Sequence, residues 1–171
     1  MKHLILAIVV FCAPITVFCQ DITGLWSGTL FNDDTQQSLP YEILIKKEKG
    51  RLTGYSQTWF LVNDKKYYGV KKIKIHTARD GKIVIQDAGL IENNYPSAPN
   101  KDLIQLNILD MVTNNNETIL NGPYVTNATR SFGSLSGRIS LKKVATSDQS
   151  SLLAYLLKNN IENDLSVTAV K

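Results

Sequence analysis

Short apolar runs separated by turn residues recur along almost the whole chain after its first twenty residues. Within most runs apolar and polar residues alternate, as in the stretch KIKIH at 72–76, which is the pattern of a strand with one buried face. There are about eight such runs, which we expect at 22–31, 41–47, 52–62, 67–77, 82–91, 103–112, 117–124 and 137–144. The alternation therefore restricts the chain to an all-β domain built from consecutive strands.

Turn-forming residues join these runs and keep most connections short. Asp80-Gly81 is the strongest local signal, because tight hairpin turns need positive φ angles that glycine adopts without steric cost. Gly50 and the pair Asn63-Asp64 mark two further hairpins. Consecutive strands joined in this way favour an antiparallel meander, which closes into an up-and-down barrel or folds into a sandwich.

The pattern changes after Val144. Polar residues at 147–151 offer several N-caps, and four leucines then recur at helical spacing: Leu152, Leu153, Leu156 and Leu157. We expect one helix of about three turns, which covers the outside of the barrel wall or docks onto a partner. The run 165–170 is expected as a short strand or as frayed chain. This divides the chain into a barrel at 20–144 and a linker, C-terminal helix and short terminal strand at 145–171.

The first nineteen residues are typical of a secretory signal peptide. Lys2 precedes an apolar run that reaches Cys19 but is interrupted by Pro14, whereas a membrane span needs about 20 uninterrupted apolar residues. We therefore expect residues 1–19 to be cleaved, with a secreted or periplasmic product that is not an integral membrane protein. Lipoprotein anchoring at Cys19 is disfavoured, because Phe18 stands where that signal has a small residue.

Cleavage would also remove both cysteines of the chain, Cys12 and Cys19. The mature protein then has no disulfide. Its chain of about 150 residues is long enough for one domain, which a hydrophobic core must hold together. The net charge of the whole chain is +4, too small to indicate nucleic acid. Six basic residues do gather, but their alternation with apolar residues predicts a solvated strand face: Lys65, Lys66, Lys71, Lys72, Lys74 and Arg79.

Residues typical of catalysis or metal binding are scarce. His76 is the one histidine that remains after cleavage, and it falls on the lysine-rich face of its strand, so we expect a surface residue rather than a general base. The stretch GSLSG at 133–137 lacks the spacing and the strand-to-helix context of a nucleophile elbow. We therefore predict no catalytic residue, no metal site and no cofactor.

Gly24-Leu25-Trp26 on the first expected strand resembles the opening Gly-x-Trp motif of the lipocalins. The order of eight antiparallel strands, a helix and a short strand is similar to that family too, although the Thr-Asp-Tyr loop of its core members has no clear equivalent. The resemblance implies a lipocalin-like, calycin-type eight-stranded antiparallel up-and-down barrel with a C-terminal helix. It also implies structural roles for Gly24, for Trp26 as the plug of one barrel end, and for Arg138 as the basic residue that covers this tryptophan.

The resemblance further implies a carrier of a small apolar or amphipathic molecule. An eight-stranded barrel holds either one small ligand or a plug of its own side chains, and both alternatives stay open. The alternation slips between Val70 and Lys72, where a bulge would exchange the faces of a strand. Eight side chains are candidates for the inner wall: Tyr41, Ile43, Tyr55, Trp59, Ile73, Ile75, Ile104 and Leu106.

Two other functions remain open. Trp59-Phe60 and Tyr67-Tyr68 flank one expected hairpin, and adjacent strand residues point to opposite faces, so one aromatic of each pair is expected to point outward. A self-filled barrel could then act as a non-catalytic interaction module that binds a protein or glycan through exposed aromatic hairpins. A calycin-type isomerase or cyclase is the third alternative.

Two Asn-x-Thr stretches match the acceptor pattern of N-glycosylation, at Asn116 and Asn127. The pattern has consequences only in a cell that glycosylates exported proteins.

Overall fold

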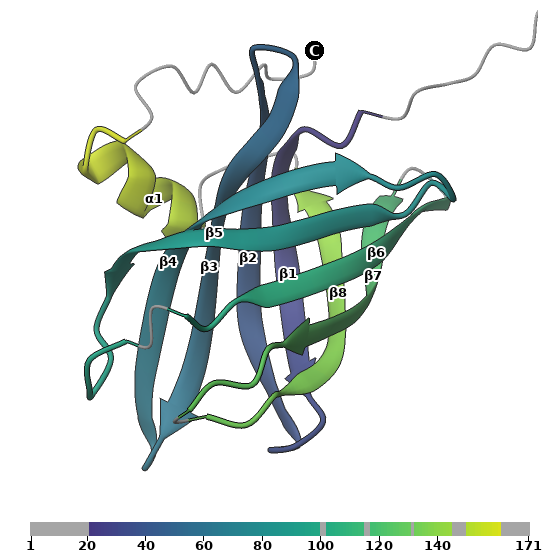
Figure 1. The fold of residues 1–171 in the computed structure, drawn as a ribbon. Coiled ribbons are helices and arrows are strands. Elements are labelled where there is room, and N and C mark those ends of the chain that lie inside the picture. Colours follow the sequence, from purple (N-terminus) through teal and green to yellow (C-terminus); the bar gives the residue numbers. More distant parts are fainter. Residues whose placement is uncertain (1–20, 100–101, 115–116, 131, 145–149, 162–171) are drawn as a thin grey trace, which may run out of the picture.

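A computed structural model describes residues 21–99, 102–114, 117–130, 132–144 and 150–161. In these residues eight antiparallel strands follow one another in sequence order, and the last pairs with the first to close a barrel (Figure 1). The predicted all-β barrel with a C-terminal helix is confirmed. The strands are β1 (Gly24–Asn32), β2 (Gln37–Glu48), β3 (Arg51–Val62), β4 (Lys65–Thr77), β5 (Ile83–Asn93), β6 (Gln105–Asn114), β7 (Glu117–Thr126) and β8 (Ser136–Val144).

Two hairpins have two-residue loops in which both residues adopt positive φ. These are Lys49 and Gly50 at 47° and 80°, and Asn63 and Asp64 at 49° and 60°. Loops of this kind match the right-handed twist of the strands they join. Gly81 reaches a φ of 85° in the turn between β4 and β5. The turn residues identified from the sequence therefore lie where the chain reverses.

The inward faces of the strands form one apolar core. Its fully buried members come from strands all around the barrel and include Trp26, Ile43, Ile73, Ile85, Leu109, Leu120, Ile139 and Leu141. Burial of a side chain of this size contributes roughly 1.5–3 kcal/mol. The core extends from Trp26, near the barrel end at which β1 begins, to Leu30 and Tyr124 near the opposite end. We refer to the opposite end, which carries the connections after β1, β3, β5 and β7, as the polar end.

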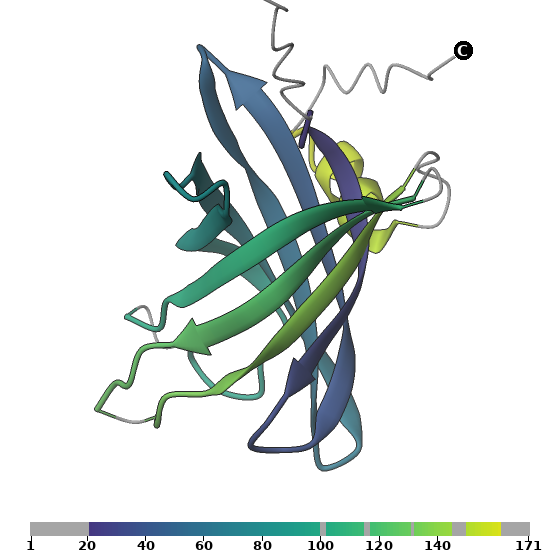
Figure 2. The same ribbon diagram turned by 90° about the vertical axis from the view of Figure 1, so that its right-hand side faces the viewer.

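Helix α1 (Ser151–Lys158) lies outside the barrel against β2 and β3 (Figure 1, Figure 2). Leu152 and Leu156 are buried in a second cluster with outward side chains of the wall, among them Leu44 and Val70. The helix spans 8 residues, so it is shorter than expected, and the fourth leucine of the expected stripe, Leu157, is exposed. This helix was expected either to cover the barrel wall or to dock onto a partner, and in the structure it covers the wall. The expected signal peptide and terminal strand lie outside the described residues.

The seam between β5 and its neighbours is irregular. The pairing of β4 with β5 shifts register between Val70 and Lys71 and again between Lys72 and Ile73, because Ile91 and Ala88 of β5 have no partner on β4. The irregularity lies where a slip was predicted, but it belongs to β5, and β4 keeps its alternation of faces through this stretch. On its other side, β5 pairs with β6 from Ile83 to Gln86. Beyond Gln86, the described residues of β5 pair with β4 but no longer with β6, so this side of Asp87 has no strand partner among them.

Candidate functional site

Four of the eight side chains expected on the inner wall belong to the barrel core: Tyr41, Ile43, Ile73 and Ile75. They come from β2 and β4, which flank β3 in the barrel. The expectation holds for these two strands because their apolar residues alternate with polar ones. Whether any of these side chains contacts a ligand is a separate question.

Tyr55 and Trp59 were expected inside the barrel, and the structure contradicts this. The pairing of Ser56 with Ile43 turns the even-numbered residues of β3 inward and its odd-numbered residues outward. Tyr55 accordingly packs in the cluster under helix α1. Trp59 is buried on the same outer face, with the Lys66 Nζ 5.2 Å from its ring centroid. The helix and a lysine stem give these aromatics apolar surroundings that the alternation cannot distinguish from a barrel core.

Ile104 and Leu106 were also expected inside, and they lie outside. Gln105 and Asn107 are the buried residues of this stretch, whereas Ile104 is 38% exposed and Leu106 is half-buried. Both line a hollow of about 430 Å³ on the outer face together with Val125. The start of β6 thus turns amides inward and aliphatic side chains outward, so hydrophobicity indicated the wrong face.

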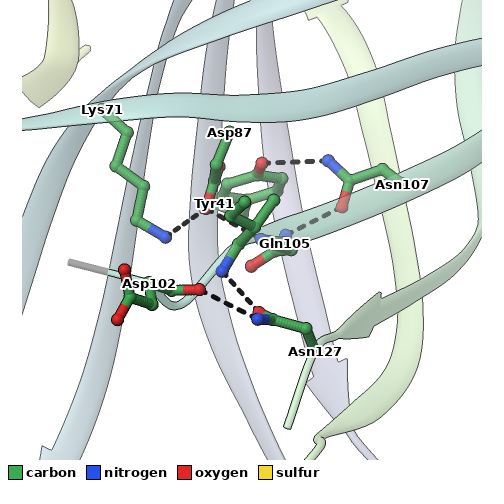
Figure 3. Close-up of polar contacts among 8 residues, drawn as sticks. Tyr41, Lys71, Asp87, Asp102, Gln105, Asn107 and Asn127 are labelled. Carbon is green, nitrogen blue, oxygen red and sulfur yellow. Dashed lines mark hydrogen bonds and ion pairs between the residues drawn. The ribbon is translucent and has the colours of Figure 1, made fainter. Parts of the chain in front are cut away.

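The buried amides belong to a polar cluster inside the barrel (Figure 3). Asn107 Nδ2 donates to the Tyr41 hydroxyl over 3.2 Å, and Gln105 Nε2 donates to Asn107 Oδ1 over 2.8 Å. Burial raises the pKa of Tyr41 far above its usual value, and the negative charge of Asp87 adds to this rise. The phenol therefore stays neutral and keeps its proton at physiological pH.

A buried ion pair completes the cluster. Lys71 Nζ lies 2.5 Å from Asp87 Oδ2, and the two side chains are only 16% and 8% exposed. The same carboxylate oxygen accepts the backbone N–H of Gln105 over 3.1 Å, where the pairing of β5 with β6 ends. Lys71 was expected on a solvated face, but it lies on the inner face of β4, two residues before Ile73 and opposite Ser56. Such pairs are weak sources of stability because both charges lose their hydration.

The hydroxyl of Ser56 lies on the inner face, where Ser56 pairs with Ile43 on one side and with Lys71 on the other. The residue is 1% exposed. Its hydroxyl is close enough to oppose the rise in the Tyr41 pKa, but in the described part of the chain Ser56 Oγ makes no hydrogen bond. A buried hydroxyl without a partner costs roughly 1–3 kcal/mol.

Three aromatic rings form a rim at the polar end, further along the inner face of β3. The Phe60 ring stacks on Tyr67 with centroids 5.8 Å apart and meets Tyr95 at 5.1 Å. Tyr95 follows β5, and its hydroxyl fills the space that a Cβ on Gly69 would occupy. Burial raises the pKa of Tyr95 to about 12, with a smaller contribution from Asp87. No sequence pattern predicted the inward position of Tyr95, because this residue lies in a connection rather than in a strand.

Asn127 holds the chain in place just before β6 through two hydrogen bonds. Its Nδ2 donates to the backbone oxygen of Asp102 over 2.9 Å, and its Oδ1 accepts the N–H of Ile104 over 2.7 Å (Figure 3). The amide nitrogen that a glycan would modify is therefore engaged in the fold. The other acceptor pattern, at Asn116, lies outside the described residues.

The opposite end of the barrel is closed by Trp26, which is fully buried and donates its indole N–H to the Ile22 oxygen over 2.9 Å. Lys143, not Arg138, covers it: Lys143 pairs with Trp26 across β1 and β8 and places its Nζ 5.8 Å from the ring centroid. Arg138 sits at the polar end over Phe31, with its side chain 72% exposed. Gly24 adopts a φ of 117°, which favours glycine.

Other features of the described residues add no second site. His76 is exposed among lysines on β4, as expected. A larger hollow, of about 1130 Å³, opens to solvent beside the β2–β3 hairpin and is lined by charged side chains together with Leu52 and Ile75. In the described ranges no three His, Cys, Asp or Glu side chains gather around a point that would suit a metal ion. None of the helices described is long and apolar enough to cross a membrane.

Comparison with protein families, with curated proteins and with solved structures found no match to this chain. The closed eight-stranded antiparallel barrel followed by a helix is compatible with a lipocalin-like fold. Inferences about function therefore rest on the barrel and on the chemistry of its polar end.

Proposed function

We propose that this protein is an exported, lipocalin-like barrel that binds a small amphipathic molecule at its polar end, without covalent chemistry. The observation that carries the proposal is the buried polar cluster around Tyr41, with the unpaired hydroxyl of Ser56 and the ion pair of Lys71 and Asp87. The fold does not need these groups, because apolar side chains there would stabilise a barrel at least as well. Few, convergent polar groups beside aromatic side chains are typical of small-molecule sites.

The aromatic rim gives the apolar part of such a molecule its contact surface. Phe60, Tyr67 and Tyr95 border the polar cluster at the end of the barrel. Because Tyr95 fills the space above Gly69, we propose that a ligand reaches the cluster when this ring moves aside. The ring belongs to the connection after β5, and beyond Gln86 this strand pairs with β4 but not with β6 among the described residues.

Export is the second part of the proposal. It is supported by the basic residue, apolar run and polar boundary of the first nineteen residues. Edman sequencing of the protein recovered from the periplasm or the medium of its own cells tests this part. Recovery of the uncleaved chain from the cytoplasm would contradict it.

Capture of a protein or glycan by exposed aromatic hairpins is less well supported. Trp59 is buried, and its neighbours Phe60, Tyr67 and Tyr68 are half-buried. An enzyme would need a general acid or base free to exchange a proton, whereas His76 is exposed and the buried Lys71 and Asp87 are bonded to each other. The binding of a small molecule uses the groups that the barrel does bury.

Two adjacent aromatics provide the test, because Phe60 lies on the inner face of β3 and Trp59 on the outer one. Titration of the folded protein with Nile red should show one saturable site. We expect Phe60→Ala to weaken this binding by about tenfold, through loss of apolar contact, and Trp59→Ala to leave it within about twofold. Circular dichroism confirms that both variants are folded. Absence of saturable binding to the wild type, or equal losses in the two variants, would contradict the proposal.

A further inference from the structure

The polar end of the barrel also restricts the chemical class of the ligand, an inference that rests on the proposed function. Its two buried charged side chains neutralise each other, since Lys71 Nζ bonds to Asp87 Oδ2. Asp87 is held in place by a second bond, from the Gln105 N–H. The cluster therefore presents a balanced pair rather than an unsatisfied charge.

A charged ligand group would disturb this balance. A carboxylate that approached Lys71 would also approach Asp87, and an ammonium group that approached Asp87 would meet Lys71. Either one would bring a like charge close to one member of the pair in a buried site, and such an approach is strongly unfavourable. The geometry of the pair thus works against both fatty acids and amines.

The groups that remain available are neutral. Ser56 Oγ makes no hydrogen bond of regular geometry in the described part of the chain, although it lies near enough to the Tyr41 hydroxyl to lower the pKa of that group. It can therefore donate to a ligand oxygen placed beside both hydroxyls. The Tyr41 hydroxyl accepts a bond from Asn107 and keeps its own proton to donate. A ligand hydroxyl or carbonyl oxygen can pair with both groups without a change in charge.

We infer that the ligand is an uncharged apolar molecule with a hydroxyl or carbonyl group, recognised by Ser56 and Tyr41 beside the closed ion pair of Lys71 and Asp87. This class includes long-chain alcohols, aldehydes and ketones. Long-chain carboxylates and amines of the same length are excluded from tight binding.

Three probes with the same chain test the inference: decanol, decanoate and decylamine, titrated calorimetrically into the wild-type protein at neutral pH. We expect decanol to bind with an affinity at least about tenfold higher than that of either ion, because it leaves the buried pair intact. A wild-type preference for decanoate or decylamine would overturn the class of ligand but leave a binding protein. Binding of none of the three would instead remove the proposed function and this inference with it.

Two variants test whether the ion pair causes the preference for decanol over the two ions. Asp87→Asn keeps the shape of the side chain but leaves Lys71 unpaired, so we expect decanoate to become the tightest ligand. Asp110→Asn is the matched control, because it breaks the exposed pair with Lys82, 2.7 Å long, on the barrel surface. In that control we expect the order of affinities for the three probes to be the same as in the wild type. If folded Asp87→Asn also shows the wild-type order of affinities, the proposed role of the ion pair is overturned.

Ser56→Ala tests the hydroxyl itself. Loss of one neutral hydrogen bond should weaken decanol binding by about fivefold, whereas Ser140→Ala on the exposed face of β8 should not change it. Unchanged decanol binding in folded Ser56→Ala would overturn the assignment of this group. The wild-type comparison of the three probes stands even if a variant fails to fold.

Discussion

Trp26 and Lys143 show at the level of single residues how the barrel is closed. The indole is removed from water, and the lysine that covers it also donates to the backbone oxygen of Asp21 over 2.8 Å. Replacement of a buried aromatic by alanine costs about 3–5 kcal/mol. A cation over an aromatic ring at an exposed site adds about 0.5–1 kcal/mol. The tryptophan therefore contributes most of the stability of this end, and the lysine a smaller part.

We predict that Trp26→Ala lowers the free energy of unfolding by about 3–5 kcal/mol, measured by urea denaturation. In double-mutant cycles with Trp26→Phe, Lys143→Ala should show a coupling energy of about 0.5 kcal/mol. Arg138→Ala is the control and should show no coupling, because Arg138 lies over Phe31 at the other end. Coupling of Trp26 to Arg138 instead of Lys143, or a loss under about 1 kcal/mol for Trp26→Ala, would refute this account.

The residues of the candidate site were only partly predictable. Tyr41 was selected because it alternates with Ile43 and Ile45, which are also buried. Gln105 and Asn107 were missed, because burial of amides is favourable only when hydrogen-bond partners from other strands are present. The inward positions of Ser56 and Lys71 depend on strand register and on the partner that Asp87 provides for the lysine, which hydrophobicity does not encode.

Helix α1 is the element whose attachment depends most on one distant side chain. Glu42 lies on the outer face of β2 and is 7% exposed. Its Oε2 accepts the Leu152 N–H over 2.8 Å and the hydroxyls of Ser150 and Ser151 over 3.1 Å and 3.2 Å. A carboxylate at a helix N-terminus is favoured by the helix dipole and by the free N–H groups there.

We predict that Glu42→Gln lowers the free energy of unfolding by about 1–2 kcal/mol and exposes the helix to limited proteolysis. Glu48→Gln is the matched control on the same strand, because Glu48 is exposed and bonds only to Lys46 among the described contacts. Equal protease resistance of the Glu42 variant and the wild type would argue that the leucines alone hold the helix.

The elements themselves were the most predictable level of this protein. Period-two alternation indicated most of the strands, and glycine or asparagine marked the tight turns, because both signals depend on neighbouring residues alone. The helix was expected from its leucines, but its length was not, since Asn159 ends it with a non-helical backbone. The partial pairing of β5 with β6 was not predictable either, because it depends on distant backbone contacts.

The whole molecule is a barrel with two unlike ends. One end is plugged by Trp26 within an apolar core, and the other contains the polar cluster of Tyr41, Lys71 and Asp87 under an aromatic rim. Closure of β8 onto β1 makes the inward face a separate environment from the outward one. The sequence predicted a meander, but the choice between a barrel and a sandwich needed the register of all the strands.

The central claim is that this barrel carries a small amphipathic molecule, and native mass spectrometry of the mature protein purified gently from its own cells tests it most directly. We predict a mass above that of the polypeptide by one discrete increment, which denaturant releases as an uncharged compound with a hydroxyl or carbonyl group. A mass equal to that of the polypeptide alone, with no shift after the addition of mixed lipids, would contradict the claim.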